Sequence, residues 1–154
     1  MGFLSEYKAK LTDADDAVKC VKSGDWVEYT SNLGFPVLCD AALAKRRDEL
    51  KGVKIRGDLI FGPVQVIECD PEMEHFVYNT WHCSGYERKM CDKGRAFFEP
   101  MVFRNLACTI RIFSPRTCAW SRCPAWTMRA ISISAPRWAC QNALRITHGQ
   151  SSSK

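Results

Sequence analysis

Hydrophobic residues in the first 106 positions are spaced alternately at the period of a helix and at that of a strand. Thr12 can cap a helix, with Asp15 three residues later as the acidic half of a capping box, and Gly24 ends it. The apolar face of this helix comprises Ala14, Ala17, Val18 and Val21. A short strand is predicted to follow over 25–29, because it is rich in residues that favour strands.

A turn over 31–36 leads into a second predicted helix, because Pro36 suits the first turn of a helix. This helix is expected to continue to Leu50, with charged residues over 45–49 on its solvent side. Its apolar positions are Leu38, Ala41, Ala42 and Leu50.

Two further strands are predicted over 53–61 and 76–81. Ser84 and Glu87 form a second capping box, which starts a helix that stops at Gly94. Strands that alternate with helices of this length indicate an α/β fold with a mainly parallel sheet.

Residues 107–154 do not continue this pattern. Three prolines interrupt a stretch without a helical or strand period, and no cap precedes an apolar run. All 17 acidic residues lie in 1–106, where 15 Lys and Arg leave a net charge of −2. The tail has no acidic residue but holds six Arg, one Lys, four of the nine Cys and three of the five Trp. We therefore predict that the tail is irregular and poorly structured.

The basic tail brings the net charge of the chain to +5 and permits an alternative function. A non-enzymatic protein could use the tail to bind the phosphates of a nucleic acid. Such arms are poor in apolar residues, however, whereas this tail contains Trp120, Trp126 and Trp138. We expect no nucleic-acid partner. Unchanged nucleic-acid affinity after deletion of 107–154 would count against the alternative.

The beginning of the sequence has no basic segment followed by an apolar run, and no membrane span is visible. We therefore expect a cytoplasmic location, reduced thiols and no membrane partner. Cys118 and Cys123 have no second cysteine pair or histidine cluster that would complete a zinc site. We predict no metal.

Two turns carry the candidate substrate-binding residues. Gly34 and Pro36 precede a helix amino terminus, where free N–H groups and a positive dipole suit a phosphate or a carboxylate, although most such turns only reverse the chain. His82 and Ser84 follow the strand over 76–81. His82 could act as an acid or base, but a lone histidine is more often a structural hydrogen-bonding group. No catalytic triad or dyad follows from the spacing, so no catalytic residue is assigned.

Taken together, residues 1–106 resemble the acetyl-CoA hydrolase/transferase family, particularly its butyryl-CoA:acetate and 4-hydroxybutyrate CoA-transferase members. The resemblance covers essentially all of this part. The segments that carry it are 7–12, 17–19, 21–27, 34–36, 40–46, 81–89, 92–94 and 100–104. The turn over 31–33 lacks a Gly that relatives often have. The resemblance therefore does not determine which acyl group the pocket accepts.

The resemblance implies a partial CoA-transferase-like amino-terminal domain (the NagB/RpiA/CoA-transferase type), half of a two-domain α/β enzyme that forms homo-oligomers. In the family, a Glu of the carboxyl-terminal half attacks the acyl-CoA thioester, and a free carboxylate such as acetate then takes the CoA. None of the 17 acidic residues here matches that Glu, so we expect an inactive chain. Coenzyme A is a substrate of the parent enzyme, and no cofactor is implied. In a second interpretation the parent is an acetyl-CoA hydrolase, in which water resolves the thioester.

The family pattern stops at Leu106, and back-translation of the tail indicates a change of reading frame. One constant shift restores family-like order in three places, which begin at Cys108, Trp126 and Leu144. The shifted stretch from Trp126, for example, permits Met-Asp close to Gly-Tyr-Phe-Asn-Phe. An out-of-frame tail also explains the missing acidic residues and the surplus of Arg, Cys and Trp. We predict that 107–154 is frameshifted.

Overall fold

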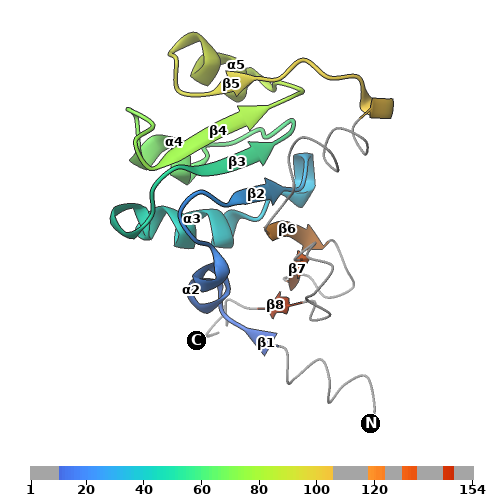
Figure 1. Cartoon of the computed structure of the whole chain (residues 1–154). Helices are drawn as coiled ribbons and strands as arrows, with labels where there is room; N and C mark the ends of the chain where they lie inside the picture. Colours follow the sequence, from blue (N-terminus) through green and yellow to red (C-terminus); the bar gives the residue numbers. More distant parts are fainter. Residues whose placement is uncertain (1–10, 106–117, 124–129, 135–143, 148–154) are drawn as a thin grey trace, which may run out of the picture.

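The computed structural model of the chain describes residues 11–105, 118–123, 130–134 and 144–147. These residues form one eight-stranded sheet, with the order β1-β8-β7-β6-β2-β3-β4-β5. Figure 1 shows the strands following one another in this order, from β1 at the bottom to β5 at the top. In the described part of the chain, no helix is long and apolar enough to cross a membrane.

Five neighbouring strands of this sheet are all parallel, in the order β6-β2-β3-β4-β5. They are β6 (Cys118–Cys123), β2 (Trp26–Tyr29), β3 (Val53–Gly57), β4 (Phe76–Thr80) and β5 (Phe97–Phe98). Helices connect consecutive strands from β2 to β5: α3 (Val37–Lys45), α4 (Gln65–Cys69) and α5 (Gly85–Asp92). The predicted α/β fold with a mainly parallel sheet is confirmed.

The core lies between the helices and one face of the parallel strands. Val27, Ile55 and Tyr78 are neighbours across β2, β3 and β4 and are almost completely buried. Two tyrosines of this face reach the helices: Tyr29 donates a hydrogen bond to Asp40 of α3, and Tyr78 donates one to Glu87 of α5. The strand alternation therefore places the helix layer against this face.

Local signals placed several element boundaries correctly. The capping box of Ser84 and Glu87 is present at the start of α5, and Gly94 follows the helix with a φ of +70°. Strand β2 covers most of the predicted 25–29. The boundaries of α5 could be predicted because its capping box and its terminal glycine act within a few residues of sequence.

Predictions about two helices were wrong, and a third helix was missed. The cap of α2 (Ala14–Ala17) is Asp13, because Thr12 belongs to strand β1 (Leu11–Thr12) and its backbone is already paired. Helix α3 ends at Lys45, and η3 (Arg47–Glu49) continues as a 3₁₀ helix. Helix α4 was not foreseen, since five residues are too few to show a helical period.

Three segments of the tail are strands, where the sequence predicts irregular structure. Strand β6 pairs parallel with β2, and the antiparallel strands β7 (Ala130–Ser134) and β8 (Leu144–Thr147) follow it in the sheet. The sequence of β7 alternates Ile with Ser, a pattern of period two. The edge of β2 supplies backbone groups with which the tail can pair, and only the folded sheet presents that edge.

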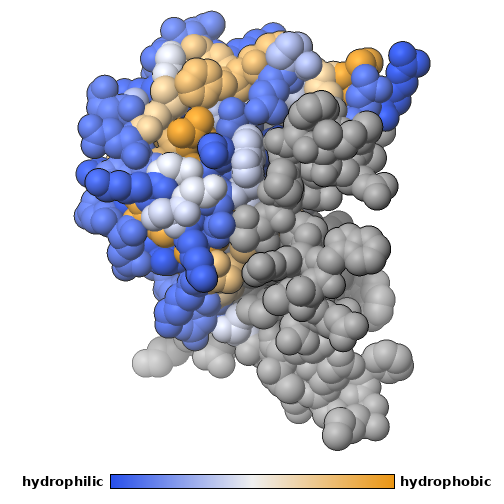
Figure 2. All heavy atoms as spheres, in the orientation of Figure 1, coloured by the Kyte–Doolittle hydropathy of each residue, from blue (hydrophilic) through white to orange (hydrophobic). Residues whose placement is uncertain are grey.

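Hydrophobic side chains also remain at the surface. Figure 2 shows them gathered in the upper part of the molecule, over β5 and the segment that follows it. Phe97, Phe98 and Val102, which belong to this region, are each more than half exposed. Such residues at one end of an open sheet mark a region that further structure can cover.

Candidate functional site

The three loops that follow β2, β3 and β4 meet at the carboxyl-terminal edge of the parallel sheet. Between the loops after β2 and β3, the backbone N–H of Asn32 donates a hydrogen bond to the backbone carbonyl of Asp58 at 3.1 Å. Between the loops after β3 and β4, the backbone N–H of Leu59 donates to the His82 carbonyl at 2.9 Å, and the Ser84 hydroxyl donates to the Ile60 carbonyl. Open α/β sheets bind their ligands at this edge.

The structure brings all four predicted site residues to this edge, in two separate places. Gly34 and Pro36 lie in the loop after β2, and Pro36 is the residue at which α3 begins. His82 and Ser84 lie in the loop after β4. Their role in substrate binding stays a prediction.

Gly34 ends a short 3₁₀ turn, η2 (Asn32–Gly34), and its N–H donates to the Ser31 carbonyl at 3.1 Å. The left-handed position of this loop is Asn32, with a φ of +56°. Asparagine tolerates that conformation better than most residues do. The left-handed conformation in this loop therefore falls on Asn32 and not on Gly34.

A cavity of about 330 Å³ lies between the loops after β2 and β3. Its apolar lining includes Leu33, Phe35, Val37, Ile60, Phe61 and Pro63. Gly34 and Pro36 are not in the lining, but their immediate neighbours in sequence are. Phe61 is 65% exposed and Leu33 is 83% exposed, so apolar surface is open to a ligand here.

The buried carboxylate of Asp40 also lines this cavity. It accepts hydrogen bonds from the Tyr29 hydroxyl at 3.1 Å and from the backbone N–H groups of Gln65 at 2.6 Å and Val66 at 3.4 Å. These N–H groups begin α4, so Asp40 caps that helix from α3. Sequence reasoning missed Asp40; the available signal was a single acidic residue within the apolar stretch 37–44.

Burial raises the pKa of Asp40 to about 6, against the effect of its three hydrogen bonds. Burial, followed by the charge of Asp40, raises the pKa of Tyr29 well above its ordinary value. The Asp40 carboxyl can therefore change its charge in mildly acidic solution, whereas Tyr29 stays protonated and acts as a donor.

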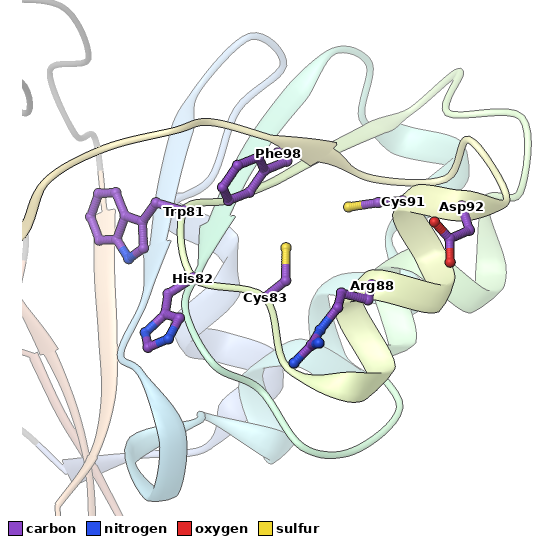
Figure 3. Close-up of a pocket in the computed structure, with 7 residues that line it drawn as sticks. All are labelled: Trp81, His82, Cys83, Arg88, Cys91, Asp92 and Phe98. Atoms are coloured by element: carbon purple, nitrogen blue, oxygen red, sulfur yellow. The ribbon is translucent and has the colours of Figure 1, made fainter.

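A second cavity, of about 380 Å³, lies beside the loop after β4. Figure 3 shows the sulfurs of Cys83 and Cys91 directed into one space, with the rings of Trp81 and Phe98 beside it. Burial is the main cause that raises the pKa of both thiols, to about 11 for Cys91. These cysteines are therefore poor nucleophiles.

His82 lines the second cavity, and its side chain is 72% exposed. Its Nδ1 lies 3.9 Å from Oδ1 of Asp58, beyond hydrogen-bonding distance. Burial raises the pKa of Asp58, whereas a hydrogen bond from Trp81 and the charge of His82 lower it. His82 is thus accessible to a ligand, but its ring is not held in one orientation by this contact.

Ser84 is buried, and the fold uses its hydroxyl. This group donates to Ile60 and accepts the N–H of Glu87 at 3.2 Å. The Glu87 carboxylate in turn accepts from Ser84 N–H at 2.9 Å, Ile60 N–H at 3.1 Å and the Tyr78 hydroxyl at 2.9 Å. Ser84 and Glu87 therefore hold the loop after β3 against the loop after β4.

A buried arginine lies on the opposite face of the sheet. Arg56 is 1% exposed, and its guanidinium carbon lies 4.7 Å from the ring centre of Trp26 and 5.3 Å from that of Trp81. Nη1 is 3.3 Å from Glu28, and Nε is 3.5 Å from Glu99. Sequence reasoning missed this cluster, which balances a buried charge with two carboxylates and two aromatic faces.

Metal ligands do not cluster in the part of the chain that the structure describes. There, no group of three or more His, Cys, Asp or Glu side chains is placed so that it could hold a metal ion. The chemistry that the described residues offer is an apolar cavity at the edge of the sheet and a second cavity lined by His82 and two thiols.

The amino-terminal part of the chain is similar to curated CoA-transferases. It is 42% identical over 106 residues to the butyryl-CoA:acetate CoA-transferase of Anaerostipes caccae, which covers 69% of this chain and 24% of that enzyme. It is 49% identical over 106 residues to a probable butyrate:acetyl-CoA coenzyme A-transferase of Syntrophomonas wolfei, covering 66% and 23%. A 4-hydroxybutyrate coenzyme A transferase of Clostridium kluyveri is 29% identical over 97 residues, covering 63% and 22%. The chain thus spans about a quarter of the length of these relatives.

Solved structures share the fold. RipA from Yersinia pestis matches with a TM-score of 0.61 and 18% identity, covering 71% of this chain and 28% of RipA. A point mutant of RipA matches with a TM-score of 0.67 and 16% identity, covering 75% and 29%. No family model matches the chain. The curated relatives nevertheless confirm that the amino-terminal part of this chain resembles the acetyl-CoA hydrolase/transferase family, and within it the butyryl-CoA:acetate and 4-hydroxybutyrate CoA-transferases.

Proposed function

We propose that this chain is the amino-terminal part of a CoA-transferase that moves CoA between an acyl-CoA and a free carboxylate such as acetate. The acyl group is acetyl, butyryl or 4-hydroxybutyryl. The observation that carries the proposal is the 42% to 49% identity to butyrate and acetate CoA-transferases over 106 residues. The apolar cavity at the carboxyl-terminal edge of the sheet supports it.

In this proposal the cavity beside α3 receives the acyl chain. Leu33, Val37 and Phe61 present exposed apolar surface in its lining. Burial of a short alkyl chain against such surface contributes roughly 0.8 kcal/mol per methylene. Asp40 maintains the geometry of the cavity, because its carboxylate is occupied by Tyr29 and by the first turn of α4. It is not the carboxylate that attacks the thioester.

The attacking Glu belongs, by the family resemblance, to the carboxyl-terminal half of the parent enzyme. We therefore propose that this chain does not turn over substrate by itself. The purified chain is incubated with butyryl-CoA and acetate, with a full-length butyryl-CoA:acetate CoA-transferase as the positive control, and acetyl-CoA is measured. No acetyl-CoA above the blank is expected. Clear turnover would overturn the proposed inactivity.

If the purified chain does turn over, the same assay without acetate separates transferase from hydrolase chemistry. Release of free CoA that is independent of acetate would favour the hydrolase interpretation of the parent enzyme.

Sequencing the coding DNA across Leu106 and beyond tests the proposed frameshift of 107–154. The proposal would be contradicted if the shifted reading frame reached a stop codon before it encoded a Gly-rich segment with a Glu.

Ligand binding tests the cavity without any need for turnover. Phe61→Ala removes exposed apolar surface from the lining, so the affinity for butyryl-CoA should fall by about tenfold, while that for free CoA should hardly change. Phe97→Ala, which alters an exposed aromatic residue outside this cavity, is the matched control. Equal losses of affinity for both ligands would place the acyl chain elsewhere.

A further inference from the structure

Two cysteines that are 98 residues apart in the sequence meet in the fold. Cys20 ends the 3₁₀ helix η1 (Val18–Cys20), and Cys118 begins β6. Their sulfurs lie 3.3 Å apart. The pairing of Cys118 with Val27 in β2 brings β6 to this place, while buried Val18 fixes η1 against the same core.

The surroundings give the two thiols different properties. Cys20 is exposed, whereas Cys118 is 2% exposed. A hydrogen bond from Cys118 is the main cause that lowers the pKa of Cys20, with Arg46 acting in the same direction and burial opposing it. Cys39 is buried nearby, and burial and the charge of Cys20 raise its pKa to about 12. The thiolate therefore forms at Cys20, where a reagent can reach it.

We propose that Cys20 and Cys118 are a thiol pair that a small disulfide such as oxidised glutathione converts to an intramolecular disulfide. The Cys20 thiolate attacks one sulfur of the reagent, forms a mixed disulfide and releases one glutathione thiolate. Cys118 then gives its proton to solvent and attacks the Cys20 sulfur, which releases the second glutathione. The two protein thiols lose two electrons, and the glutathione disulfide gains them.

The geometry suits this cross-link. A disulfide requires sulfurs about 2.05 Å apart, so the two atoms must approach by little more than 1 Å from their present separation of 3.3 Å. The bond would fasten β6 to the segment that precedes β2. This inference is independent of the proposed CoA-transferase function, because it involves neither cavity at the carboxyl-terminal edge of the sheet.

The second cysteine pair provides an internal comparison. Cys83 and Cys91 also lie close together, in the cavity beside α5. Burial raises the pKa of both, and neither thiol has the lowered pKa of Cys20. We expect them to react with oxidised glutathione more slowly than the Cys20–Cys118 pair does.

The test uses the whole folded chain, reduced and then exposed to oxidised glutathione. After acid quenching and alkylation, trypsin releases Cys20 in the peptide 20–22 and Cys118 in the peptide 117–122. We expect the chain to lose two titratable thiols and these two peptides to be joined in mass spectrometry. Joining of Cys20 to Cys39, found in the peptide 23–45, in place of Cys118 would overturn the proposal.

Variants then test the order of the two steps. Cys118→Ala should leave Cys20 as a stable glutathione mixed disulfide, and Cys20→Ser should leave Cys118 unmodified because it is buried. Cys91→Ser is the matched control and should preserve the cross-link. In denaturant the preference for the 20–118 pair should disappear; equal yield of that pair in folded and denatured chain would contradict a role for the fold.

Discussion

Strand β2 pairs with β3 on one side and with β6 on the other, and different interactions stabilise the two pairings. On the β3 side, Glu28 and Arg56 form an ion pair across the strands, and Lys54 N–H donates to Asp25 at 2.8 Å. Ser84 and Glu87, which form the cap of α5, also link the loop after β4 to the loop after β3 through Ile60. On the β6 side, the paired strand lies in the tail, which the sequence predicts to be irregular.

The β6 side depends on backbone pairing and on one large ring. The N–H and the hydroxyl of Thr30 both donate to the Trp120 carbonyl at 3.0 Å. The Trp120 ring stacks on Tyr29 with its centre 5.9 Å away, and it is completely buried. A strand can therefore join a sheet through an exposed edge and a buried aromatic contact, even when its own sequence has no strand period.

The largest effect on stability is expected from Trp120, on the β6 side. Because the ring is completely buried, Trp120→Ala should lower the free energy of unfolding by about 4 kcal/mol, as measured by urea denaturation with circular dichroism. Trp120→Phe should cost less, because it keeps a ring and removes an indole N–H that has no hydrogen-bond partner among the residues that the structure describes. A loss below about 1 kcal/mol in the alanine variant would mean that β6 adds little to the fold.

Replacing Glu87 tests how much the hydrogen bonds between the loops after β3 and β4 contribute to stability. The variant Glu87→Ala leaves three donors without their acceptor, so the free energy of unfolding should fall by about 3 kcal/mol. Glu72→Ala, at an exposed position, is the control and should change stability by less than about 0.5 kcal/mol. Equal stability of the two variants would show that the link between the loops after β3 and β4 does not stabilise the fold.

Asp40, in the helix that connects β2 to β3, makes the stability of the fold depend on pH. Its folded pKa of about 6 lies above the ordinary value of 3.8, so in this window the folded chain keeps a proton that the unfolded chain releases. The free energy of unfolding should therefore fall as pH rises, by roughly 2 kcal/mol between about pH 4.5 and about pH 6. Urea titrations at each pH measure this slope, and Asp40→Asn should remove it. An unchanged slope in that variant would assign the titration to another group.

The candidate site could be predicted only in part from the sequence. Gly34, Pro36, His82 and Ser84 follow predicted strands, and parallel strands bring their ends to one edge. The sequence did not show that these residues lie near two separate cavities. It also did not show that the Ser84 hydroxyl is already hydrogen-bonded to Ile60. Both facts depend on contacts between loops that are distant in sequence.

Local sequence patterns were sufficient to predict the α/β alternation, the Ser84 capping box and the similarity to CoA-transferases. Each of these depends on residues near one another in the chain or on the order of short segments. Contacts between distant parts of the chain set the place of β6 beside β2, the proton equilibrium of Asp40 and the proximity of Cys20 to Cys118. Strand pairing and burial act between residues that are far apart in sequence, so no local pattern specifies them.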